Sequence, residues 1–228
     1  MDVADAGKLL SYGETVLADP HSNLEDLYYA SLIVESVAGV TSTAIDVLRK
    51  RIDSMPPSDL ERQADLLVEI VDAFPLALVE QARTTLFFHL QLCADNLDRL
   101  DDVQRLWEIA VLQPLLGEEY IPREVLLDKL AGFAYGAGFR CCAGVPAAPS
   151  LQSTRYAVDC LVRLDALDSE TEVLVRQFVE ACRTEIGYLQ RPSEYTPDDA
   201  QLELLVHVLE AMEILSLLDE SASSLGSP

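Results

Sequence analysis

Apolar residues recur every three to four positions along most of this chain, the spacing that places side chains on one face of an α-helix. The stretch 59–74 is a clear example, with an apolar stripe made by Leu60, Leu67, Ile70, Val71 and Phe74. No segment of useful length alternates apolar and polar residues between turn signals, so strands are not predicted. The pattern therefore predicts an all-α protein.

Helix starts are marked by serines that stand three residues before a glutamate, the spacing of a capping box. These serines are Ser22, Ser58 and Ser169, and Thr196 before Pro197 gives a fourth start signal. Together with prolines and glycines at the helix ends, these signals predict about ten helices. Their ranges are 2–18, 23–38, 42–55, 59–74, 76–97, 101–112, a helix from 122 into the segment 131–150, 151–164, 170–189 and 198–218.

The predicted helices form pairs that recur along the chain. Pairs starting at Ser22, Ser58, Asp101, Ser150 and Thr196 are separated by 36 to 49 residues. This period resembles that of HEAT and armadillo arrays, at ~40–47 residues, although their residue consensus is not found. We therefore predict a solenoid of HEAT-like or armadillo-like helix pairs, with a globular orthogonal helix bundle as the alternative.

The domain organisation follows from the placement of glycine, proline and serine. Residues 1–220 are predicted to form a single all-α domain, with a hinge rich in glycine and proline at 136–150. We interpret Gly132 and Gly136, four positions apart, as helical residues that let a neighbouring helix approach closely. Gly138 and Gly144 are predicted to end that helix. Residues 221–228, "SASSLGSP", are predicted to be a disordered tail.

The last predicted helix is apolar around most of its circumference. Its polar positions form one narrow stripe, which we expect to face solvent: Glu203, His207, Glu210 and Glu213. So wide an apolar surface is either enclosed by the rest of the chain or partly left for a partner. The candidate partner-binding residues are Leu202, Leu205, Val206, Leu209 and Met212.

Charge narrows the choice of partners. The chain has 39 acidic and 16 basic residues, a net charge of −23, which repels phosphate backbones and anionic lipids. We predict protein partners, with basic ones favoured, and neither nucleic acid binding nor membrane insertion. No secretory signal is present, so we expect a soluble intracellular protein, cytoplasmic or in an organelle matrix if a targeting segment was removed.

Motifs of catalysis and metal binding are missing from the sequence. It contains no phosphate-binding Gly-x-x-x-x-Gly-Lys-Ser/Thr, no Gly-x-Ser-x-Gly, no His-Glu-x-x-His and no Cys-x-x-Cys. We predict no catalytic residues, no cofactor and no metal site. Two of the five cysteines, Cys141 and Cys142, are adjacent and follow Arg140, so they are the candidate reactive thiols.

These observations favour a non-catalytic helical scaffold or adaptor that mediates protein–protein interaction as a subunit of a larger hetero-oligomeric complex. One alternative is an enzyme or small-ligand binder that uses an apolar pocket between helices. Another is an acidic chaperone for a basic protein client.

Overall fold

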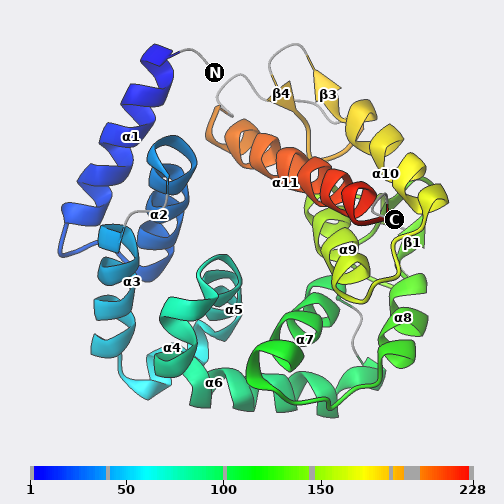
Figure 1. Cartoon of the computed structure of the whole chain (residues 1–228), viewed down its shortest axis with the longest axis horizontal. Coiled ribbons are helices and arrows are strands. Elements are labelled where there is room, and N and C mark those ends of the chain that lie inside the picture. Colours follow the sequence, from blue (N-terminus) through cyan, green and yellow to red (C-terminus); the bar gives the residue numbers. More distant parts are fainter. Residues whose placement is uncertain are drawn as a thin grey trace. The chain divides into compact units, whose positions relative to one another are not determined.

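The computed structural model describes residues 3–39, 42–99, 102–143, 147–184, 187–192 and 201–225. This part of the chain is mostly helical, with eleven α-helices and two short antiparallel strand pairs, which confirms the all-α prediction. The chain divides into two compact units, Met1–His89 (unit 1) and Leu90–Pro228 (unit 2). Figure 1 labels the α-helices of both units, which we describe separately.

Unit 1 is built from consecutive helices whose apolar faces meet in one core. They are α1 (Val3–Ala18), α2 (Leu24–Ala38), α3 (Ser42–Ser54), α4 (Pro57–Arg62), α5 (Ala64–Ala73) and the first part of α6 (Pro75–Asp95). Helix α2 packs against both α1 and α3. The most deeply buried side chains come from α2, α3, α5 and α6 and include Leu27, Leu48, Ile52, Leu67, Ile70 and Leu86.

A glycine permits the close crossing of α1 and α2. A Cβ atom added to Gly13 would lie 2.9 Å from Val34 Cγ2 and 3.2 Å from the carbonyl oxygen of Ala30. Real Cβ atoms essentially never show the shorter of these distances, so a larger residue at position 13 would require the Val34 side chain or the helices to shift.

Two helix starts lie one residue away from the predicted serines. Asn23 caps α2, because its Oδ1 accepts a hydrogen bond from the Asp26 amide at 2.8 Å. Asp168 caps α10 in the same way, accepting from the Thr171 amide at 2.7 Å. Asparagine and aspartate rank with serine as N-caps, so the capping-box spacing alone selected the wrong neighbour.

The predicted helix 59–74 is two helices. Helix α4 begins at Pro57, so Ser58 lies inside its first turn, and Gln63 separates α4 from α5. The predicted start at Thr196 lies outside the described residues.

Unit 2 begins within α6 and contains a layer of three helices. Its elements are η1 (Leu97–Arg99), α7 (Val103–Leu116), α8 (Arg123–Ala131), β1 (Ala134–Tyr135), β2 (Gly138–Phe139), α9 (Leu151–Arg163), α10 (Ser169–Ala181), β3 (Arg183–Thr184), β4 (Gly187–Tyr188) and α11 (Gln201–Leu225). Helix α9 packs against α7 on one side and α11 on the other. The core between them includes Leu106, Trp107, Ile109, Val158 and Ile214.

The glycine-rich segment after α8 is a β-hairpin, so the prediction of helical glycines there is wrong. Strands β1 and β2 pair antiparallel, and Gly136 lies in their turn with a φ of +62°. Gly138 is the position where close packing requires glycine, because an added Cβ would lie 3.0 Å from both the Phe178 ring and Pro149. The predicted hinge, residues 136–150, thus lies inside unit 2, and residues 144–146 lie outside the described part.

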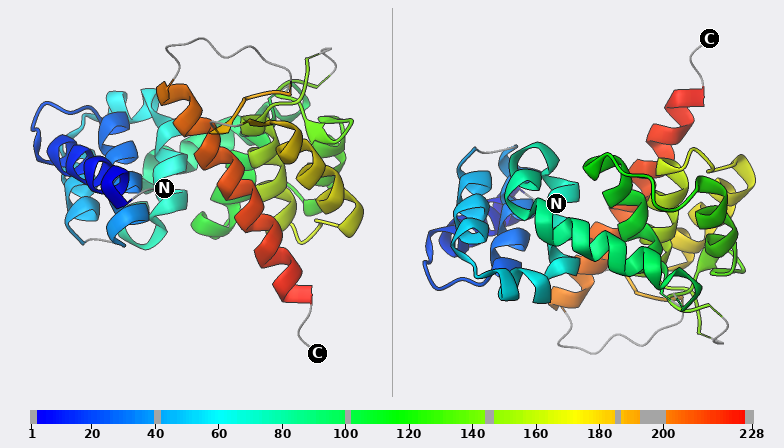
Figure 2. Two further views of the ribbon diagram at one scale, coloured as in Figure 1. Left: turned by 90° about the horizontal axis from the view of Figure 1, so that it is seen from above. Right: turned by 90° about the horizontal axis from the view of Figure 1, so that it is seen from below.

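Helix α11 is longer than predicted. It continues to Leu225, so residues 221–225 of the predicted tail are helical, while 226–228 lie outside the described residues. Figure 2 shows its C-terminal turns extending beyond the other helices of unit 2. Among the helices of the described residues, none combines the length and the apolar character that crossing a bilayer requires.

Candidate protein-binding surface

One face of α11 presents apolar side chains to solvent. Val206 is 40% exposed, Leu209 is 38% exposed and Met212 is 60% exposed. Residues three positions apart lie on the same side of a helix, so the three side chains form one continuous row, which we call the α11 stripe. The side chains of Leu202 and Leu205, the other two predicted partner-binding residues, lie outside the described part of the chain.

Carboxylates continue this face toward the C-terminus of α11. The Glu213 side chain is 47% exposed and the Asp219 side chain is 72% exposed. Each has an arginine partner from within unit 2: Arg155 for Glu213, at 3.0 Å, and Arg176 for Asp219, at 2.7 Å. The face therefore combines an apolar row with an acidic end.

The opposite face of α11 is packed into unit 2. Ala211, Ile214 and Leu218 are fully buried on it, and the helix lies against α9 and β4. Gly187 of β4 permits a close approach, since an added Cβ would lie 3.2 Å from Val208 Cγ2. The packing fixes which side of α11 meets solvent.

A buried arginine fastens α11 to the helix layer. Arg155 of α9 is 8% exposed, and its Nη1 donates to Glu213 Oε1 at 3.0 Å. Its guanidinium also lies over two rings, 4.2 Å from the centroid of Tyr156 and 5.6 Å from that of Trp107. Such cation–π contacts stabilise a desolvated guanidinium, so the ion pair and the rings together hold the helix in place.

A second buried ionic group joins α7 to α9. Asp159 is 4% exposed, and its Oδ2 accepts hydrogen bonds from Trp107 Nε1 at 2.6 Å and from Arg163 Nε at 2.9 Å. This network was not among the predictions from the sequence, although Arg155, Asp159 and Arg163 stand four residues apart. That spacing places them on one face of α9, which was the available signal.

The polar row of α11 is partly buried, contrary to the expectation that it faces solvent. Glu210 is 8% exposed, and its Oε2 lies 3.2 Å from His207 Nδ1. Burial raises the pKa of the Glu210 carboxyl, while its hydrogen bond with His207 opposes this shift. Glu210 thus lies on the inner side of α11 while the apolar stripe is exposed, whereas Glu213 of the same polar row stays about half exposed and pairs with Arg155.

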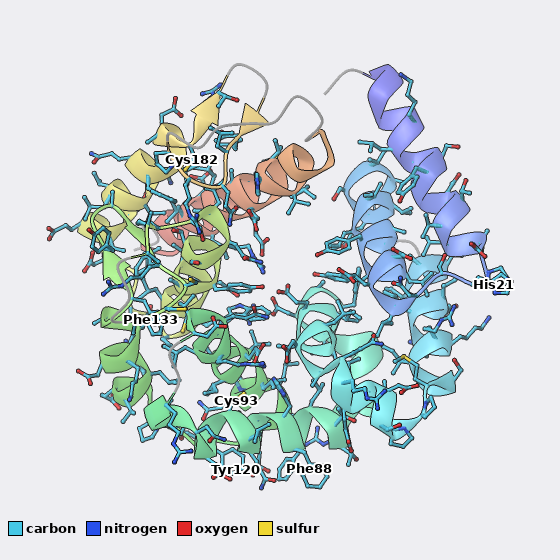
Figure 3. The ribbon with its side chains drawn as sticks, turned by 180° about the vertical axis from the view of Figure 1, so that it is seen from behind. His21, Phe88, Cys93, Tyr120, Phe133 and Cys182 are labelled. Carbon is cyan, nitrogen blue, oxygen red and sulfur yellow. The ribbon has the colours of Figure 1, made fainter. Side chains whose placement is uncertain are left out.

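The adjacent cysteines lie at the surface, in the segment after β2. Cys141 is exposed and Cys142 is partly exposed. Their backbone is attached to the start of α7, because the Val103 amide donates to the Cys141 carbonyl at 3.0 Å and Cys142 forms a β-bridge with Asp102. Cys93, Cys160 and Cys182 are buried, and Figure 3 labels the first and last of them. Burial raises the pKa of the Cys160 thiol to about 12, which leaves it unreactive.

The chain matches no protein-family model, no curated protein and no solved structure. A function for the chain is therefore inferred from the geometry of each unit.

Proposed function

We propose that this protein is a non-catalytic scaffold that binds a partner protein through the α11 stripe, as a subunit of a larger assembly. One observation carries the proposal: Val206, Leu209 and Met212 are exposed in a single row on a helix whose other face is fixed by buried packing. Rows of this kind serve as anchors when two helices pack across a protein–protein interface.

The packing order within unit 2 supports this role. Helices α7, α9 and α11 alternate in the chain with α8 and α10, yet they pack directly side by side. This order is typical of helix-pair arrays, in which each pair covers the apolar face of its neighbour. We infer a solenoid-like arrangement for unit 2, in which no other described helix covers the α11 stripe.

The acidic end of the same face defines the partner's chemistry. Glu213 and Asp219 lie on the exposed side of α11, and the chain as a whole has a net charge of −23. The matching partner is an amphipathic helix with an apolar row and with lysine or arginine at one end. Opposite charges would accelerate its association and set its direction along α11.

The test compares three tagged forms of the full chain purified from the native source. Leu209→Ser/Met212→Ser removes two apolar side chains of the stripe. Val173→Ser/Leu174→Ser on α10 is the matched control, because Val173 and Leu174 are also exposed, at 54% and 37%. Truncating a hot-spot residue costs more than about 1 kcal/mol, so the loss of two such anchors should weaken partner binding by at least about 30-fold.

The α10 control should retain the partner at the wild-type level, and circular dichroism should show the same helix content in all three forms. Equal recovery of the same proteins by the stripe variant would contradict the proposal. Recovery of no protein by any form would reject the scaffold role and leave the small-ligand alternative. Release of the partner by salt alone would instead favour the acidic chaperone, whose binding is purely electrostatic.

A further inference from the structure

A second surface of unit 2, separate from the α11 stripe, has the features of a ligand site. It is a groove of about 570 Å³ beside the β1–β2 hairpin, a volume within the range of known binding pockets. Its lining includes Tyr135, Gly136, Pro149, Phe178, Arg191 and Pro192.

The walls of the groove are fixed to one another. Gly138 packs directly on Phe178 and Pro149, as its close Cβ distances of 3.0 Å show. The Ser150 amide donates to the Phe139 carbonyl at 3.2 Å, and the Leu151 amide donates to the Gln190 carbonyl at 2.9 Å. A ligand would therefore find a largely preformed surface, which lowers the entropy lost on binding.

The charge of the groove is opposite to that of the chain. Arg191 is the charged residue among its described lining residues, and none of these is acidic, although the net charge is −23. A second guanidinium lies close by, since Arg140 is 5.4 Å from the centroid of the Tyr135 ring. Arginine binds carboxylates through two parallel hydrogen bonds. Surfaces of tyrosine, phenylalanine and proline accept the rings of an extended proline-containing peptide.

We propose that this groove binds an extended, proline-containing segment of a partner protein that places a carboxylate at Arg191. The proline rings lie against the Tyr135 ring, which is 53% exposed, while the buried Phe178 supports the groove from beneath. Because Arg191 attracts this carboxylate, the groove binds an acidic segment in preference to a basic one. This site acts independently of the α11 stripe.

Two synthetic peptides test the proposal on the full-length chain labelled with ¹⁵N. Acetyl-Glu-Pro-Pro-Tyr-Pro-Pro-Glu-amide carries the acid at both ends, so that chain direction does not matter, and the second peptide replaces both glutamates by lysine. At ~0.15 M salt the Debye length of about 8 Å screens the long-range repulsion by the acidic chain. The acidic peptide should bind about 1.4- to 5-fold more tightly, the range measured for exposed ion pairs, and should shift the Tyr135 and Gly136 amide signals.

Arg191→Glu should reverse this preference, because it exchanges the sign of the charge in the groove. Arg183→Glu is the matched control: Arg183 has a 60% exposed side chain, pairs with Glu180 and is not among the described lining residues, so the preference should persist. Leu209→Ser/Met212→Ser should bind the acidic peptide as the wild type does, which separates this result from the proposed function. Equal binding of both peptides, an unchanged preference in Arg191→Glu, or no binding at millimolar peptide would each overturn the proposal.

Discussion

Individual charged residues inside unit 2 determine how its helices meet. Asp159 accepts hydrogen bonds from Trp107 and Arg163, and Arg155 pairs with Glu213, so each charge that leaves water meets a specific partner. Replacing the buried Asp159 should cost about 3–5 kcal/mol, because its partners are left uncompensated, whereas the pair with the half-exposed Glu213 contributes less because solvent screens it. We infer that these contacts fix the register of α7, α9 and α11, as well as their proximity.

Glu210 should make the stability of unit 2 depend on pH. Burial raises the pKa of its carboxyl, so the folded state favours the protonated form. The stabilisation from this proton is complete below the ordinary pKa of 4.5 and is lost as pH rises through the raised pKa of the folded state. Glu210→Gln keeps the neutral form at every pH. Its melting temperature should therefore exceed that of the wild type by an amount that grows with pH, to a few degrees near pH 7.

Thermal unfolding followed by circular dichroism between pH 4 and pH 7 measures this difference. Glu118→Gln removes an exposed carboxylate from the loop after α7 and controls for the change in net charge. If Glu210→Gln instead becomes less stable than the wild type as pH rises, the contacts of the charged Glu210 with His207 and Arg155 outweigh the cost of burying the carboxylate.

At the scale of elements, the crossing of α1 and α2 depends on one small residue. Gly13→Ala places a methyl group 2.9 Å from Val34 Cγ2, and such overpacking costs about 1–3 kcal/mol. Gly7→Ala, on the same helix, meets no atom within 4 Å and should stabilise α1 by up to about 1 kcal/mol through helix propensity. The two substitutions are chemically identical, yet we expect opposite changes in the free energy of unfolding measured in urea.

The double variant Gly13→Ala/Val34→Ala separates steric conflict from other causes. Shortening Val34 removes the nearest clashing atom, so part of the stability lost by Gly13→Ala should return. Equal stabilisation by Gly7→Ala and Gly13→Ala would mean that α1 and α2 do not cross at this point.

For the whole molecule, the net charge of −23 is the dominant electrostatic property. Like charges repel one another more strongly in the compact state than in the unfolded chain, so charge lowers stability. Raising the salt concentration from ~0.01 M to ~0.15 M shortens the Debye length from about 30 Å to about 8 Å and weakens this repulsion. The melting temperature should rise by several degrees over this range, as calorimetry would record.

Two salts, sodium chloride and potassium chloride, distinguish general screening from binding of a particular cation. Both should give the same rise at equal ionic strength. A melting temperature that falls with salt would show that the ion pairs, such as Arg176 with Asp219, contribute more than the repulsion.

Much of the helical content could be read from the sequence because it depends on local spacing. Apolar residues that recur every three or four positions, with prolines and glycines at the ends of these stretches, predicted the all-α class and most helix ranges. The hairpin at β1–β2 could not be read this way, because strands of two residues carry no periodic signal and depend on packing against Phe178 and Thr154. Cap positions were missed by one residue where two neighbouring polar residues could each serve as the N-cap of the helix.

The sequence by itself determined that this protein is helical, strongly acidic and apolar along its last helix. The tertiary structure alone decided which face of α11 is covered. Amphipathicity assigns Glu210 to solvent, yet contacts with α9 bury it and leave Val206, Leu209 and Met212 exposed. The physical reason is that the orientation of a helix depends on partners distant in the chain, here Arg155, which lies 58 residues before Glu213.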